Sequence, residues 1–141
     1  MQIIVVLDDL RTDETFFKVA VDDSSTLGCF EEGLLKAVRS LETGVCHIYH
    51  KKFDTMSIDG ILAYIRKGTD DRLYAIAELI RRGIDLLHVY DNTKIDLFFL
   101  EKIKNIVEME SVVANNPRNA EVLRDAKRIG ISDKFIGRLW K

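Results

Sequence analysis

Residues 69–110 read TDDRLYAIAELIRRGIDLLHVYDNTKIDLFFLEKIKNIVEME. Apolar residues recur in this stretch at spacings of three and four, the pattern of two amphipathic helices. Gly83 and the pair Asn92–Thr93 separate the two helical patterns. No group suited to chemistry stands within them. We therefore expect a protein that packs against a partner rather than one that transforms a substrate.

The first of these helices is predicted to begin after Thr69, with acidic residues at 70 and 71 near its positive end. Two arginines, 81 and 82, follow at its negative end, and Gly83 ends it. Its predicted buried face consists of Leu73, Ile76, Ala77, Leu79 and Ile80.

The second helix is predicted to be the longest, from Thr93 to about Val113, with Asp96 as the capping-box partner of Thr93. Asp85 caps one short turn before it, over Leu86–Tyr90. Leu97–Leu100 are four consecutive apolar positions and cover more than one stripe, so we expect this helix to be surrounded on most sides.

Helical patterns also fill the rest of the chain after residue 29. A stripe from Phe30 to Leu41 predicts one helix, which Gly44 follows. A second begins after Ser57, and Gly68 ends it; its predicted core face is Ile58, Ile61, Leu62 and Ile65. After the turn at 115–118, two short helices are expected over 120–129 and 133–140, the latter capped by Ser132.

Residues 1–26 differ from this pattern. Gln2–Leu7 and Phe16–Val21 are short apolar runs rich in β-branched and aromatic residues, which predict two strands or an extended arm. Asp22–Thr26 is a polar break, where we place a boundary. The expected fold is all-α with six to seven helices over 27–141, preceded by a short extended or β arm over 1–26.

Composition narrows the class of protein. The chain has 141 residues, 47% of them hydrophobic, and a net charge of −2, as soluble globular domains do. Lysines and arginines are dispersed, which argues against a dedicated nucleic-acid or membrane surface. Cys29 and Cys46 form no disulfide pattern, and neither a signal peptide nor an apolar run near 18 residues is present. We expect the cytosol as its compartment.

Cys46, His47 and His50 are the residues closest to a metal-binding pattern. A closed zinc site needs a fourth ligand, and the other candidates, Cys29 and His88, lie in different elements. A structural role is therefore favoured, and we expect neither a metal nor a cofactor in this chain. The isolated glycines form no phosphate-binding loop, and the acidic pairs suit helix starts and polar loops.

Helix-turn-helix DNA binding is the alternative function. Helix, Gly83, short turn and long helix follow one another in the right order. However, residues 96–110 contain Lys102 and Lys104 against four acidic residues, a sum of −2. A helix that faces DNA phosphates requires the opposite sign, so this alternative is not favoured.

Long ordered strings identify a family. The chain resembles the oligomerisation, or connection, domain of the large subunit of carbamoyl phosphate synthetase over about Leu27 to Trp140. The strings are LGCFEEGLLKAVRSLE (27–42), TDDRLYAIAELIRRGID (69–85), NTKIDLFFLEKIKNIVEME (92–110) and AKRIGISDKFIGRLW (126–140). Two departures stand out. The family usually has an Arg-Thr pair in place of Cys29, and Met1–Ser24 does not resemble its lead-in.

The resemblance implies an all-helical fold in two small subdomains, without catalytic residues. In the family, this domain lies between two ATP-grasp halves, which use ATP and divalent metal to make carbamoyl phosphate from bicarbonate and glutamine-derived ammonia. The implied partners are a second copy of the large subunit, the ATP-grasp halves and, indirectly, the glutamine amidotransferase small subunit. The product serves arginine or pyrimidine synthesis, and the connection 46–60 looks more like the arginine branch.

Both ATP-grasp halves are missing from the 141 residues, so this segment alone is not expected to synthesise carbamoyl phosphate. We expect either an excised segment or the product of a truncated gene. A joining domain needs outward-facing apolar positions, and Leu34, Val38 and Leu41 are the predicted ones, paired across a two-fold axis. Periodicity alone is equally consistent with all three facing the domain's own core.

Overall fold

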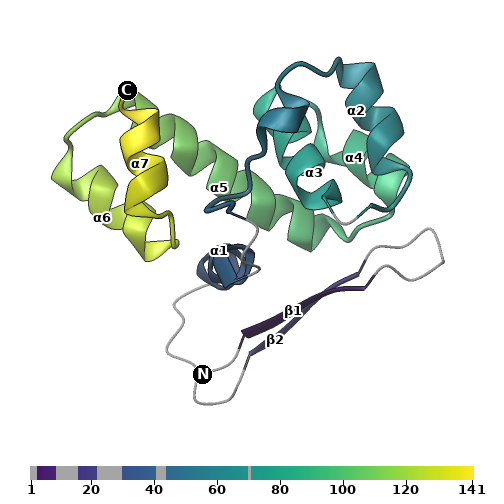
Figure 1. Ribbon diagram of the computed structural model, residues 1–141, viewed down its shortest axis with the longest axis horizontal. Helices are drawn as coiled ribbons and strands as arrows, with labels where there is room; N and C mark the ends of the chain where they lie inside the picture. Colours follow the sequence, from purple (N-terminus) through teal and green to yellow (C-terminus); the bar gives the residue numbers. More distant parts are fainter. Residues whose placement is uncertain (1–2, 9–15, 22–29, 41–43, 70) are drawn as a thin grey trace.

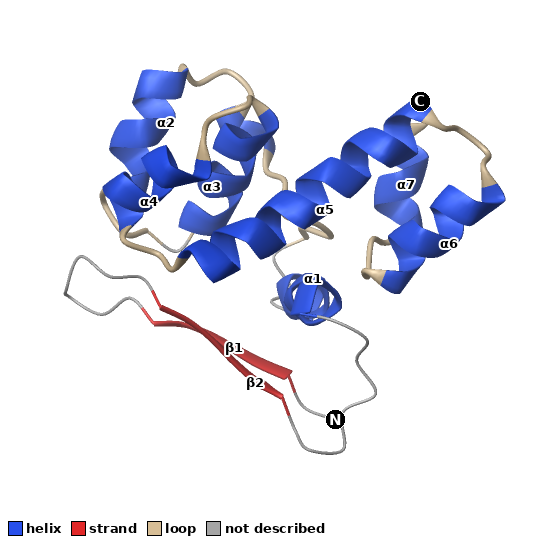
Figure 2. Cartoon of the chain, turned by 180° about the vertical axis from the view of Figure 1, so that it is seen from behind, coloured by secondary structure: helices blue, strands red, loops and turns tan. Residues whose placement is uncertain are grey.

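A computed structural model describes residues 3–8, 16–21, 30–40, 44–69 and 71–141. Within these residues seven α-helices follow a two-stranded hairpin (Figures 1 and 2). The helices are α1 (Phe30–Ser40), α2 (Ile58–Ile65), α3 (Arg72–Arg81), α4 (Leu86–Thr93), α5 (Leu97–Asn115), α6 (Ala120–Arg128) and α7 (Asp133–Leu139), with one 3-10 turn, η1 (Lys51–Phe53). The all-α prediction is confirmed for the described residues after the hairpin.

The N-terminal hairpin is formed by β1 (Ile3–Asp8) and β2 (Phe16–Val21). The strands pair antiparallel, from Ile3 opposite Val21 to Asp8 opposite Phe16. The backbone of β1 lies beside α1. Of the two forms expected for the arm, the structure has the strands.

The long helix α5 connects two groups of helices. Helices α2, α3 and α4 gather near its N-terminal end, and α6 and α7 pack along its C-terminal end (Figure 1). At 19 residues, α5 spans roughly 28 Å at 1.5 Å per residue. The two groups correspond to the two subdomains that the family resemblance implies, and α5 belongs to both.

The core follows the predicted periodicity in most places. All five residues predicted for the buried face of α3 are buried, and so are Ile61, Leu62 and Ile65 of α2. On α5, Leu100, Ile103 and Ile106 are almost fully buried. Burying each such side chain stabilises the fold by about 1.5–3 kcal/mol.

Helix α1 contacts both α5 and the turn between α6 and α7. On α5, the Asn105 amide Nδ2 donates to Oε1 of Glu31, 3.0 Å away. Toward the C-terminal helices, Nη1 of Arg39 donates to the carbonyl of Gly130 over 2.8 Å. Gly130 has a φ of +96°, and a Cβ added there would lie 2.9 Å from Cα of Glu32. The close packing of α1 on the α6–α7 turn therefore requires glycine.

The cap predictions are right at three helices and wrong at two, and the cap of α6 was not predicted. Ser57, Asp85 and Ser132 cap α2, α4 and α7 as predicted, and Asn119 caps α6. Thr93, however, is the last residue of α4, where its hydroxyl donates to the Val89 carbonyl and accepts from Ile95 N–H. Asp96 alone caps α5. A threonine hydroxyl can either cap the following helix or bond the backbone of the preceding turn. The sequence pattern around Thr93 is therefore consistent with both roles.

At the start of α3, Thr69 is not the cap. The helix begins two residues later than predicted, after Asp71, whose side chain makes no capping bond. The Asp71 carboxylate instead accepts from the Tyr64 hydroxyl over 2.5 Å and from Lys52 Nζ over 3.0 Å. These tertiary bonds outweigh the local preference for a capping role.

Two exposure predictions are wrong. Ile58 of α2 is 37% exposed rather than part of the core. The first turn of α5 is not surrounded, because Leu97 is 36% and Phe98 54% exposed while Leu100 is buried. No helix of the described residues is long and apolar enough to cross a membrane.

Candidate functional site

The connection 44–53 carries the polar side chains that join the two helix groups. His47 lies on it, 1% exposed, and its ring stacks on Phe135 of α7 at a centroid distance of 3.8 Å. Its Nε2 lies 2.6 Å from Oε1 of Glu110, which projects from α5. One buried imidazole therefore contacts both α5 and α7.

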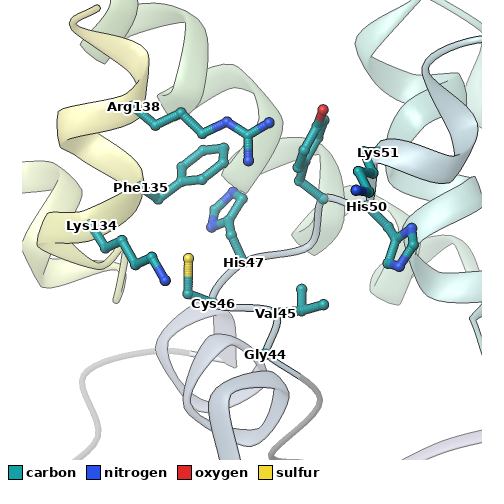
Figure 3. A pocket seen from close by; sticks show the side chains of 10 residues that line it. Gly44, Val45, Cys46, His47, His50, Lys51, Lys134, Phe135 and Arg138 are labelled. Carbon is teal, nitrogen blue, oxygen red and sulfur yellow. The ribbon is translucent and has the colours of Figure 1, made fainter.

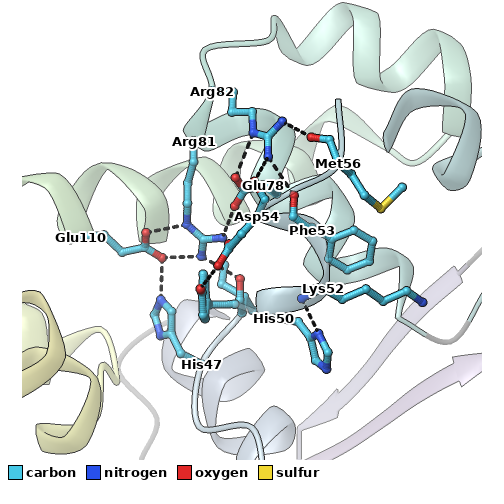
Figure 4. Close-up of polar contacts among 12 residues, drawn as sticks. His47, His50, Lys52, Phe53, Asp54, Met56, Glu78, Arg81, Arg82 and Glu110 are labelled. Atoms are coloured by element: carbon cyan, nitrogen blue, oxygen red, sulfur yellow. Dashed lines mark hydrogen bonds and ion pairs between the residues drawn. The ribbon is translucent and has the colours of Figure 1, made fainter. Parts of the chain in front are cut away.

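Glu110 also accepts two hydrogen bonds from Arg81 at the end of α3. Nε of Arg81 lies 2.7 Å from Oε2, and Nη2 lies 2.8 Å from Oε1. The guanidinium therefore binds the carboxylate in a bidentate manner (Figure 4). Nη2 donates further to the Ile48 carbonyl over 2.7 Å. We call His47, Arg81 and Glu110 the polar junction, because they join α3, α5, α7 and the connection.

The neighbouring arginine fixes the rest of the connection. Arg82 donates to the carbonyls of Met56 and Phe53 at 2.6 and 2.8 Å. Its Nε also bonds the Glu78 carboxylate at 3.0 Å (Figure 4). The sequence placed both arginines at the negative end of a helix. Glu78 is a local partner on the same helix, but Glu110 and the backbone carbonyls of the connection are tertiary partners.

Burial and charge set the ionisation of the junction. Burial acts to raise the pKa of Glu110, but the hydrogen bonds from Arg81 and His47 outweigh it and hold that pKa below its usual value. Burial lowers the pKa of His47 and outweighs the opposing bond and charge of Glu110; the positive charges of Arg81 and Arg39 lower it further. Glu110 is thus ionised and His47 neutral near pH 7.

Stability should consequently fall as the pH drops below 6.5, the ordinary histidine value. In that range the unfolded chain protonates His47 and the folded chain does not, so unfolding takes up a proton. The window of Glu110 lies lower, below 4.5. Urea unfolding between pH 7.5 and 5.5 covers the window of His47 and lies above that of Glu110. We expect His47→Gln to flatten the decline, whereas the exposed control His88→Gln keeps it; an unchanged slope in His47→Gln would contradict the assignment.

Cys46, His47 and His50 have different structural roles and do not form a common site. His47 belongs to the polar junction, and Nδ1 of His50 accepts from Lys52 N–H to cap η1 over 3.1 Å. Cys46 is half-buried beside them, His88 is exposed on α4, and Cys29 lies outside the described residues. Among the residues that the structure describes, no three His, Cys, Asp or Glu side chains are grouped to hold a metal ion.

The predicted interface residues are placed mostly inside the domain. Leu34 and Val38 are each 2% exposed and belong to the core that α1 shares with α5. Neither side chain faces outward, which corrects that interpretation for these two. Leu41 lies outside the described residues. The physical reason is that Leu34 and Val38 lie on the face of α1 that packs into the core beside α5.

Exposed apolar side chains gather instead at the start of α5. Leu87 of α4 is 57% exposed, and it shares with Leu97 the lining of an open hollow of about 450 Å³. Phe98 follows Leu97, and its ring lies 6.2 Å from that of Phe30. We call Leu87, Leu97 and Phe98 the apolar surface. Contiguous exposed side chains of this kind mark contact surfaces in many proteins.

Sequence reasoning missed the polar junction, although one signal was present. Glu110 stands on the buried stripe of α5, seven residues after Ile103 and three before Val113. A carboxylate at a core position requires a buried cation as its partner. The sequence did not identify Arg81 as that cation, because the two residues meet only when α3 packs on α5.

A family model agrees with this helical arrangement. The model described as carbamoyl-phosphate synthetase large chain, oligomerisation domain, matches residues 27–141. The match covers all seven helices and every residue of the polar junction and the apolar surface. The chain therefore belongs to the family of the carbamoyl-phosphate synthetase large chain, of which residues 27–141 form the oligomerisation domain.

Proposed function

We propose that this domain is a structural, subunit-joining part of a carbamoyl phosphate synthetase large chain and performs no chemistry itself. The observation that carries the proposal is the family match over 27–141, together with a polar junction whose side chains bond one another. In the parent protein, ATP and divalent metal would act in the ATP-grasp halves. The glutamine amidotransferase subunit would then be an indirect partner, and arginine or pyrimidine synthesis the pathway.

The joining role needs two kinds of surface. We assign the apolar surface to packing against the ATP-grasp part of the same large chain, since its exposed leucines and phenylalanine are uncovered in the domain alone. We assign contact between two large subunits to the region after α1, where Leu41, outside the described residues, follows the apolar spacing of the sequence. Leu34 and Val38 then support that region from the core.

Three substitutions separate these roles in the 141-residue chain. Leu41→Glu should abolish self-association in sedimentation velocity while leaving the helical circular dichroism intact, because a carboxylate would be desolvated at the two-fold contact. Phe98→Glu should keep both self-association and fold, since that ring is already exposed. Leu34→Glu should unfold the domain, because it places an unpaired charge in the core.

Two results would contradict the proposal. Unfolding of Leu41→Glu would place Leu41 in the core, and an unchanged sedimentation profile at concentrations where the unmodified chain associates would remove it from the interface. A chain that stays monomeric at all accessible concentrations would contradict self-association by this segment.

DNA binding has less support than the joining role. Helix α5, which would be the recognition helix, packs against α1, α3, α4, α6 and α7. A recognition helix has to leave one long face free for the major groove. Retention on a DNA column that weakens with salt would favour this alternative, and we expect none.

A further inference from the structure

An open cavity of about 320 Å³ lies where the connection 44–51 faces α7, and its lining is cationic. Lys51, Lys134 and Arg138 line it, and no carboxylate residue does. None of the three forms an ion pair within the described part of the chain. A pocket lined by charges of one sign raises the local concentration of the opposite ion.

Two of these cations stand over the buried histidine. Lys134 and Arg138 are one helical turn apart on α7 and extend toward the loop that carries Cys46 and His47 (Figure 3). Arg138 also lies over the Tyr49 ring, 4.3 Å from its centroid, which fixes its guanidinium at the edge of the cavity. Lys51 stands at the other side, next to His50 (Figure 3).

His47 contributes a polar atom that lacks a partner. Its Nε2 is engaged by Glu110, while Nδ1 is buried and has no hydrogen-bond partner among the described residues. The ionised Glu110 carboxylate only accepts, so Nε2 carries the proton and Nδ1 of the neutral ring is an acceptor. A buried polar atom without a partner destabilises the fold by about its desolvation energy. Because His47 lines the cavity, a bound ligand could supply the missing donor.

We propose that this cavity binds a small oxyanion that also carries a hydroxyl group, of which hydrogen phosphate is the simplest example. Lys134 and Arg138 neutralise the negative oxygens, and the hydroxyl donates to Nδ1 of His47. The site is independent of the subunit-joining role. It lies against the polar junction, so its occupation would stiffen the contact of the connection with α7.

Titration of the 141-residue chain with inorganic phosphate at pH 7.0 tests the site. Backbone amide shifts measured by NMR should move saturably at residues 44–51 and 134–138 and remain still elsewhere. Sulfate matches hydrogen phosphate in shape and charge but lacks its hydroxyl group, so we expect sulfate to bind several-fold more weakly. Glycerol 3-phosphate distinguishes a phosphate ester from a free oxyanion as the ligand. If it binds more tightly than phosphate, the ligand is a phosphate ester; if it binds more weakly, the ligand is a free oxyanion.

Lys134→Gln and Arg138→Gln should each weaken phosphate binding about fivefold. This is the effect of losing the attraction between two opposite unit charges about 4 Å apart in water. Arg128→Gln, which removes one exposed charge on α6 away from the cavity, should leave the affinity unchanged. Equal losses in all three variants indicate a general charge effect and overturn the site. Shifts that do not saturate, or equal affinity for sulfate and phosphate, overturn the proposal as well.

Discussion

Replacing Glu110 with alanine is expected to lower the free energy of unfolding by about 3–5 kcal/mol. The substitution removes the carboxylate that makes two short bonds to the Arg81 guanidinium, whose side chain is 16% exposed. Among the carboxylates of the described residues, it leaves Arg81 only the longer contact with Glu78 at 3.3 Å. It also leaves Nε2 of His47 without its acceptor in a site 1% exposed. Urea unfolding followed by circular dichroism at 222 nm measures the loss directly.

Two matched variants show where that energy comes from. Glu110→Gln keeps the size of the side chain and an acceptor oxygen, so we expect a loss clearly smaller than that of alanine. An apolar triple variant, His47→Leu with Arg81→Met and Glu110→Leu, removes all three residues of the polar junction at once. It should recover much of the loss, as buried ion pairs replaced by apolar groups do. A Glu110→Ala loss below about 1 kcal/mol would mean that water already solvates the junction.

The second large effect is expected at Gly130, where alanine should destabilise the fold by about 2–5 kcal/mol. Two causes add: the positive φ of +96° disfavours any residue with a Cβ, by about 1–2 kcal/mol. The new Cβ also meets the backbone of Glu32 at 2.9 Å, which forces α1 away at a further 1–3 kcal/mol or so. Thermal and urea unfolding of Gly130→Ala measure the sum.

Gly83→Ala is the matched control for Gly130→Ala. Gly83 has a similar φ of +84°, but a Cβ there would meet nothing within 4 Å. Its alanine variant therefore pays only the conformational term, about 1–2 kcal/mol. The difference between the two variants isolates the close approach of α1. Equal losses would show that α1 adjusts without strain, and the steric explanation would fail.

Local pattern predicted the helices well because their signals are local. Ser57, Asp85 and Ser132 cap helices whose first turns follow directly, and Gly44, Gly68, Gly83 and Gly130 all have the positive φ expected after a helix. The buried face of α3 follows from spacing alone. These features need no knowledge of what the helix packs against.

Features that depend on tertiary contacts were not predictable in the same way. Thr93 ends α4 because its hydroxyl bonds back to Val89, an alternative as local as the capping box. Leu34 and Val38 fitted a core and an interface equally until α5 was placed beside them. The polar junction joins residues 29 and 63 positions apart, and no sequence spacing encodes such a meeting.

The continuity of α5 has a mechanical consequence. From Leu97 to Asn115 it contains neither glycine nor proline, the usual causes of a kink. A tilt imposed on α3 and α4 at one end must therefore be passed on as a rigid rotation to α6 and α7 at the other. We therefore expect the two helix groups to move together, because α5 contains no glycine or proline hinge between them.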